Sequence, residues 1–150
     1  MQGNLPKARS HLHKASQQLE KAQVYSWGPE EPAECVSAAF YSYENAVVAA
    51  AEALGLPWKT NHYDKAEVAA RLSREKNLKT DVSDLLLDLN GLRKDVSYGE
   101  PGEELSQYDL EGLVTNLENF IGEVDNLVTE LEEEEETEEH APEGKTEQGE

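Results

Sequence analysis

The sequence predicts an all-α protein, an up-and-down bundle of four to five helices followed by a disordered acidic C-terminal tail. Apolar residues recur at steps of three and four through most of residues 5–131, which is the spacing of one helical face. Only two Phe and two Trp occur among 150 residues, so the core must be mostly Leu, Val and Ala with a few tyrosines. Strands are richer in aromatic residues, and the length suits one domain.

The first helix begins near Leu5 and ends before Trp27, because Gly28 and Pro29 interrupt the pattern. Its apolar residues lie one helical turn apart and predict a single buried face. They are Leu5, Ala8, Leu12, Ala15, Leu19 and Ala22.

The second helix spans about residues 32–54, and Gly55 and Pro57 end it. Alanines on several of its sides allow neighbouring helices to approach closely, so we expect it to be the central helix of the bundle. Its apolar stripe consists of Val36, Phe40, Tyr43, Val47, Ala50 and Leu54.

Two further helices follow a loop. The third is expected to begin at Asp64, with Glu67 completing a capping box, and it is short. The fourth runs from Asp81 to about Val96 and ends before the turn-forming residues 99–102. The apolar residues of the pair are Val68, Ala69, Leu72, Val82, Leu85, Leu86, Leu89 and Leu92.

A last helix opens at Ser106 with Asp109 and continues to Leu131. Beyond it, residues 130–150 hold eleven Glu and one Lys, a net charge of −10 out of −19 for the chain. A segment with so few apolar side chains cannot offset its ordering entropy. We therefore divide the chain into a bundle over residues 1–131 and a disordered Glu-rich tail over residues 132–150.

The charge also bears on partners. Residues 1–129 carry the other −9, so the body is acidic in its own right and no local basic patch is evident. Such a surface repels phosphate backbones, and binding of a nucleotide or RNA is not supported by charge. The tail could mimic nucleic acid or recruit a basic partner, although acidic tails more often act as solubilising segments.

Cys35 is the single cysteine, which excludes an intramolecular disulfide and suggests a reducing compartment. No acid–base partner lies near it in sequence, so a small buried residue is expected rather than a nucleophile. The N-terminal residues lack the apolar run of a signal peptide, and no run approaches about 18 apolar residues. We expect a cytoplasmic protein without a membrane span.

The histidines offer little catalytic signal. His11 and His13 are two residues apart on a helix, which points the rings about 200° apart and disfavours a shared metal. His62 lies in the loop before the third helix, either near a site or capping that helix, and the structural role is favoured. No phosphate-binding loop or CxxC pair occurs, so no cofactor or metal is expected.

Arg93 lies at the end of the fourth helix, one residue after the apolar Leu92. A partly buried guanidinium needs a carboxylate or phosphate partner. An internal ion pair to Glu44, to Glu52 or to a symmetry mate is the favoured interpretation, and a ligand-binding role is the alternative.

Four segments in this order resemble the HEPN family, named for its occurrence in higher eukaryotes and prokaryotes with nucleotide binding. They are residues 15–22, residues 38–46, residues 60–62, and Leu92-Arg93 leading to Asp95, Tyr98 and Gly99. The resemblance covers about residues 5–128. It implies a helical bundle that forms a homodimer through a two-fold interface.

The resemblance also bears on catalysis. In ribonuclease members an Arg is followed four to six residues later by His, which acts as the acid–base group. Here Arg93 matches the arginine, but Tyr98 stands where the histidine is expected. A phenol with a pKa of about 10 is a poor general base at neutral pH. The run is similar to a non-catalytic branch that commonly pairs with a minimal nucleotidyltransferase.

Three functions follow as hypotheses. The first is a non-catalytic, dimeric binding or regulatory protein, the partner of a minimal nucleotidyltransferase in a toxin–antitoxin-like pair. The second is a degenerate ribonuclease toxin that uses Arg93 with Tyr98 or His62. The third is a generic helical protein-interaction module.

Overall fold

The computed structural model describes residues 3–27, 32–97 and 108–145. Within these residues the chain is all-α, with five helices and no strand: α1 (Leu5–Trp27), α2 (Pro32–Leu54), α3 (His62–Arg74), α4 (Ser83–Ser97) and α6 (Leu110–Lys145). The predicted all-α bundle is confirmed. No helix in the described part of the chain is long and apolar enough to cross a membrane.

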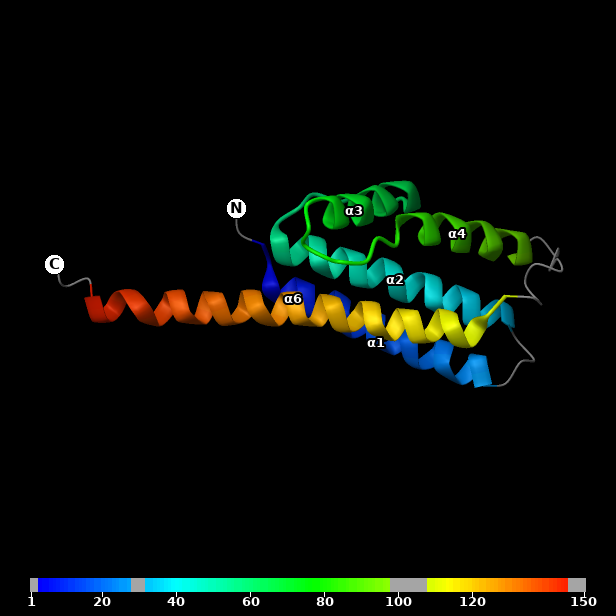
Figure 1. Ribbon diagram of the computed structural model, residues 1–150, viewed down its shortest axis with the longest axis horizontal. Helices are drawn as coiled ribbons and strands as arrows, with labels where there is room; N and C mark the ends of the chain where they lie inside the picture. Colours follow the sequence, from blue (N-terminus) through cyan, green and yellow to red (C-terminus); the bar gives the residue numbers. More distant parts are fainter. Residues whose placement is uncertain (1–2, 28–31, 98–107, 146–150) are drawn as a thin grey trace.

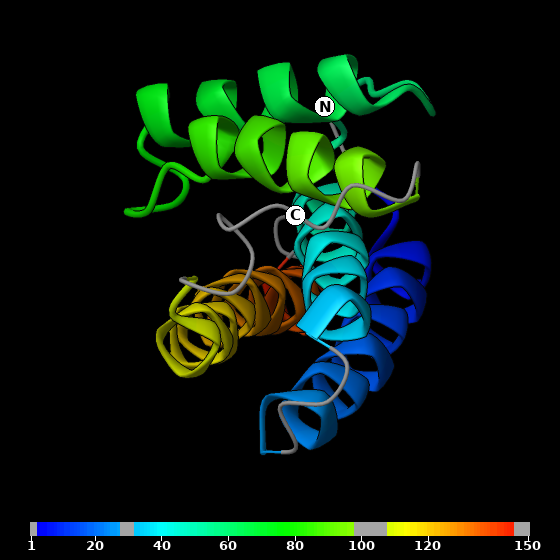
Figure 2. The same ribbon diagram turned by 90° about the vertical axis from the view of Figure 1, so that its right-hand side faces the viewer.

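The helices form two layers that meet on α2. Figure 1 shows α1, α2 and α6 running along the long axis, and Figure 2 shows α3 and α4 side by side across one side of α2. Helix α2 packs against all four other described helices, whereas α3 packs mainly against α2 and α4. The predicted central position of α2 is confirmed.

Composition explains why α2 can have so many neighbours. Fifteen of its residues are buried, and seven of these are alanines. Small side chains let helix axes approach closely. At one such approach the buried Ser42 hydroxyl donates a hydrogen bond of 2.6 Å to the carbonyl of Ala15 on α1. Gly55 ends α2 with φ 74°, where Leu56 N–H bonds the Ala51 carbonyl across 2.8 Å.

Two predicted helix starts are wrong by two residues. Helix α3 begins at His62 rather than Asp64, because Asn61 is its N-cap and its side-chain oxygen accepts from the Asp64 N–H at 2.9 Å. Helix α4 begins at Ser83, and the carboxylate of Asp81 accepts from the Ser83 N–H at 2.9 Å. In both cases a short polar side chain that precedes the helix accepts a hydrogen bond from a backbone N–H of the first helical turn.

Helix α6 begins and ends differently from its prediction. Asp109 accepts from the Gly112 N–H at 2.9 Å and caps the start, while Ser106 lies outside the described residues. The helix runs beyond Leu131, where the sequence predicted its end, to Lys145. Figure 1 shows this part projecting past the bundle. Glu is a good helix former, so helical geometry continues here without an apolar face.

Candidate functional site

The candidate site is built around Glu44, a carboxylate in the middle of α2. Its side chain is only 4% exposed. A buried carboxylate is unfavourable unless it is paired and hydrogen-bonded. Two side chains from the first turn of α3 meet this need: His62 Nδ1 lies 2.6 Å from Glu44 Oε2, and Lys65 Nζ lies 3.4 Å from Oε1.

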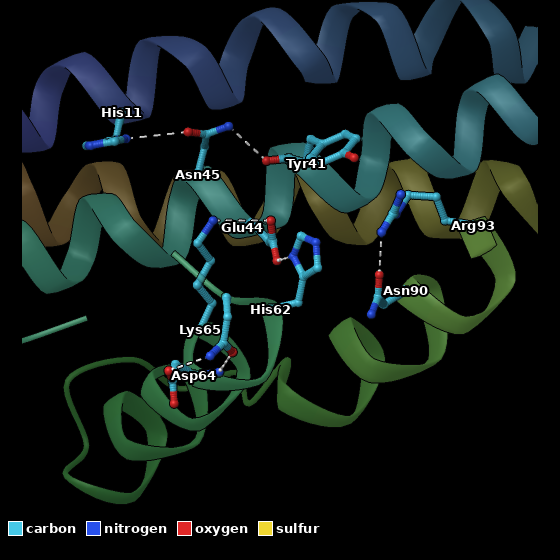
Figure 3. Close-up of polar contacts among 10 residues, drawn as sticks. His11, Tyr41, Glu44, Asn45, His62, Asp64, Lys65, Asn90 and Arg93 are labelled. Atoms are coloured by element: carbon cyan, nitrogen blue, oxygen red, sulfur yellow. Dashed lines mark hydrogen bonds and ion pairs between the residues drawn. The ribbon is translucent and has the colours of Figure 1, made fainter. Parts of the chain in front are cut away.

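The start of α3 determines this geometry. Asn61 caps the helix, so His62 is its first residue and Lys65 follows at i+3 on the same face. Both side chains therefore point toward α2, as Figure 3 shows. His62 was predicted to lie in the loop before the helix, either near a site or capping the helix. It is instead the first helical residue, and Asn61 is the cap.

Phe40, one turn before Glu44 on α2, contacts both His62 and Arg93. The His62 ring meets the Phe40 ring edge-on with centroids 5.1 Å apart. The guanidinium carbon of Arg93 lies 5.2 Å from the Phe40 centroid and 5.5 Å from that of Tyr41. A cation over an aromatic ring is attracted by the ring quadrupole. His62 and Arg93, which follow Phe40 by 22 and 53 positions in the sequence, thus meet on its ring.

Arg93 is also held by its own helix. Its Nη2 donates a 2.7 Å hydrogen bond to the side-chain oxygen of Asn90, which is buried. The two acidic partners suggested for Arg93 have other bonds: Glu44 pairs with His62 and Lys65, and Glu52 accepts from the Trp58 indole at 2.9 Å. Figure 3 shows Arg93 reaching α2 from α4.

Tyr98, the other site residue predicted from the sequence, lies outside the described residues together with the turn at residues 99–102. The sequence interpretation named Glu44 only as an ion partner of Arg93 and missed its pairing with His62. A signal was present in the sequence, because Glu44 is an acid that directly follows Tyr43 of the predicted apolar stripe in an Ala-rich helix.

His11 and His13 lie outside this cluster. His13 is exposed, as expected. His11 was also expected at the surface, but it is half-buried, with Nδ1 3.4 Å from the Asn45 side-chain oxygen and its ring edge-on to Trp58. Among the described residues, no three His, Cys, Asp or Glu side chains gather closely enough to hold a metal ion.

Cys35 is fully buried on α2, as predicted, and its thiol donates to the Ala22 carbonyl at 3.4 Å. Burial raises the pKa of this thiol to about 11. The thiolate, which is the reactive form, is therefore scarce at neutral pH.

The chain matches no protein-family model, and no curated protein or solved structure resembles it significantly.

Proposed function

We propose that this chain is a non-catalytic HEPN-like protein that acts as a homodimer and as a binding or regulatory partner of a minimal nucleotidyltransferase. The observation that supports a binding role is the arrangement of Arg93 and Tyr41. The guanidinium is held by the Asn90 side chain and by two aromatic rings, and the adjacent Tyr41 is 38% exposed. Arg and Tyr held rigidly at a surface are typical of interface hot spots.

The kind of partner follows from the resemblance alone, since the non-catalytic HEPN branch with Arg, Asp and Tyr-Gly commonly pairs with minimal nucleotidyltransferases. The charge of the chain agrees with a protein partner. At a net charge of −19, sequence-independent binding to nucleic acid is disfavoured.

The proposal is tested by co-expression of the tagged chain with the reading frame beside its gene, followed by co-purification and sedimentation. We expect a dimer that retains the partner. Arg93→Ala should weaken partner retention or dimerisation, whereas Lys94→Ala, an exposed cation one residue further on, should not. A monomer at micromolar concentration, or no co-purification when a nucleotidyltransferase is encoded alongside, contradicts the proposal.

One observation favours a second candidate, a ribonuclease. Phe40 brings His62 and Arg93 to the same ring, and the buried Glu44 binds His62 at Nδ1. A carboxylate at one ring nitrogen orients an imidazole so that the other can transfer a proton, and a guanidinium binds phosphate. This ribonuclease would use His62 in place of Tyr98.

Cleavage of total RNA by the purified protein distinguishes the two functions. The ribonuclease requires cleavage that both His62→Ala and Arg93→Ala abolish and that His13→Ala leaves unchanged. Absence of cleavage by the clean wild-type protein removes this candidate.

A further inference from the structure

A groove with a volume of about 480 Å³ lies between α1 and α6. All of its lining residues belong to these two helices, which lie on the opposite side of α2 from α3 and α4 in Figure 2. We call it the α1–α6 groove. It shares no residue with the cluster of Glu44, His62 and Arg93, so it is a separate surface of the molecule.

The α1–α6 groove follows the two helices. Its lining residues extend from Arg9 to Leu19 on α1 and from Glu118 to Asp125 on α6, and they recur about one helical turn apart. At a rise of about 1.5 Å per residue, these stretches are roughly 10–15 Å long, which equals about two to three turns of a third helix. The shape therefore suits helix-in-groove recognition, in which an amphipathic helix lays its apolar face into a groove.

Apolar side chains line part of the groove. Leu12 and Ile121 belong to the hydrophobic core, and Leu19 packs against the core while remaining partly exposed. An apolar side chain of a partner that enters the groove would contact these residues and extend the core outward. Contacts of this kind are favourable because they remove apolar surface from water.

Gly122 lies in the α6 wall of the groove and is exposed. A Cβ built at this position has open space around it: beyond the adjacent residues and the backbone of its own helix, it meets no described atom within 4 Å. Glycine is unfavourable in the interior of a helix, but it allows another backbone to approach closely. Gly122, with the small Ser16 on the α1 wall, leaves room for a helix in the groove.

The charged groups at the groove are mainly negative. Arg9 is the one Lys or Arg among the described lining residues, and its guanidinium already bonds Asp125 and Glu132. Glu118 also lines the groove and forms no ion pair with any described residue. These four residues carry three negative charges and one positive charge.

The remaining charges of the two helices do not reverse this sign. Residues 110–132 of α6 contain six Asp or Glu and no Lys or Arg. Helix α1 has three further cations, but none of them lines the groove: Lys7, Lys14 and Lys21. A helix with Lys or Arg beside its apolar face is therefore attracted to the groove, whereas an acidic helix or a nucleic acid is repelled.

We propose that the α1–α6 groove binds a basic amphipathic helix of a partner protein. The apolar side chains of this helix contact Leu12, Leu19 and Ile121, its Lys or Arg side chains lie beside Glu118, and its backbone passes close to Gly122. The site goes beyond the proposed function and does not depend on it, because it uses neither Arg93 nor Tyr41.

Fluorescence anisotropy of labelled peptides with the full chain tests the proposal. The probe is a peptide of about 14 residues with Leu at i, i+4 and i+7, Lys on both flanks and Ala elsewhere. We expect saturable binding of this Lys peptide. A peptide with Glu in place of Lys should bind at least about tenfold more weakly. A peptide of the same composition with its leucines rearranged, which has no apolar stripe, should also bind at least about tenfold more weakly.

Two pairs of variants locate the binding site. Gly122→Leu fills the groove and should weaken binding of the Lys peptide at least about tenfold. Gly91→Leu makes the same change on α4, where a Cβ also has open space, and should leave binding unchanged. Glu118→Gln should weaken binding about threefold, whereas Glu111→Gln, at an exposed acid outside the groove, should not.

Melting curves show whether the glycine variants fold. Both should melt no lower than the wild type, because Leu is a better helix former than Gly. Three results overturn the proposal. They are no saturable binding of the Lys peptide, equal binding of the rearranged peptide, and equal effects of Gly122→Leu and Gly91→Leu. Dissociation of a dimer by Gly122→Leu also overturns it, because the groove is then covered by a second copy of this chain.

Discussion

His62 Nδ1 lies 2.6 Å from Oε2 of Glu44, so a residue at the first turn of α3 is bound to a carboxylate that α2 buries. When the imidazole is protonated, the contact is an ion pair; otherwise it is a hydrogen bond. In either form it ties the second layer of helices to the central one. The contact therefore has a structural consequence whether or not His62 takes part in chemistry.

Removing the His62 side chain should destabilise the fold. His62→Ala leaves the buried Glu44 with Lys65 alone, and an under-satisfied buried polar group costs roughly 1–3 kcal/mol. We expect the free energy of unfolding, measured with urea, to fall by about 2 kcal/mol. The control His13→Ala changes an exposed histidine and should have no measurable effect. Equal stability of the two variants would show that the His62 contact contributes little.

Enlarging a side chain of α2 should also destabilise the fold. Ala46 is fully buried and lies one turn after Ser42, where α1 and α2 approach closely. Ala46→Leu should lower the free energy of unfolding by roughly 1–3 kcal/mol, because added methylene groups in a packed core force backbone shifts. Ala70→Leu makes the same change at a partly exposed site on α3 and should cost less. A tolerated Ala46→Leu would indicate unfilled space beside α2.

Arg9 joins α1 to α6 through several bonds, and these should make stability depend on pH. Its Nε and Nη2 donate to the two carboxylate oxygens of Glu132 at 2.9 Å, and Nη1 donates to Asp125 at 2.6 Å. The hydrogen bonds from Arg9 lower the pKa of Glu132. Since the folded pKa lies below the unfolded one, the contribution is present above the ordinary carboxyl pKa and is lost as pH falls through the folded value.

Glu132→Gln should therefore lower the free energy of unfolding by about 1 kcal/mol at pH 7, a value limited by solvent screening of this partly exposed pair. The difference in free energy of unfolding between the wild type and Glu132→Gln should become smaller as the pH drops below about 4. Glu133→Gln, a change at the exposed neighbour, should give a stability close to wild type across the pH range. If this difference stays constant down to pH 3, the pH dependence of stability does not come from the ion pair of Arg9 and Glu132.

The projecting part of α6 should add little to the stability of the bundle. Residues 133–137 are exposed, and among the described residues Leu131 is the last apolar side chain of α6 that packs against the core. Deletion of residues 134–150 should leave the melting temperature unchanged, whereas deletion of residues 132–150 should reproduce the loss seen with Glu132→Gln. Melting curves of the two truncated chains provide the comparison, and a large loss from the shorter deletion would reveal a packing role for the tail.

Cys35 should be unreactive in the folded protein. With a pKa raised to about 11 by burial, only about a thousandth of the thiol is thiolate at pH 8. Iodoacetamide should label it slowly in buffer and rapidly in urea, with mass spectrometry as the measurement. Rapid labelling without urea would mean that α1 and α2 separate readily.

The sequence by itself determined the helical class, the bounds of α2 and the central position of this helix. These are consequences of local periodicity, of Gly55 and Pro57, and of a run of alanines, all of which can be read along the chain. It missed the start of α3 because Asn61 and Asp64 are both good capping residues, and only the backbone geometry distinguishes them.

Only the tertiary structure decided which side chains meet. Phe40, His62 and Arg93 belong to three helices, and their contact depends on how α3 and α4 lie across α2. The same holds for a surface hollow that is lined by Trp58, which precedes α3 in the sequence, and by Arg74, the last residue of α3. Periodicity identifies the buried face of each helix, but the pairing of faces depends on the shapes of all the side chains between them.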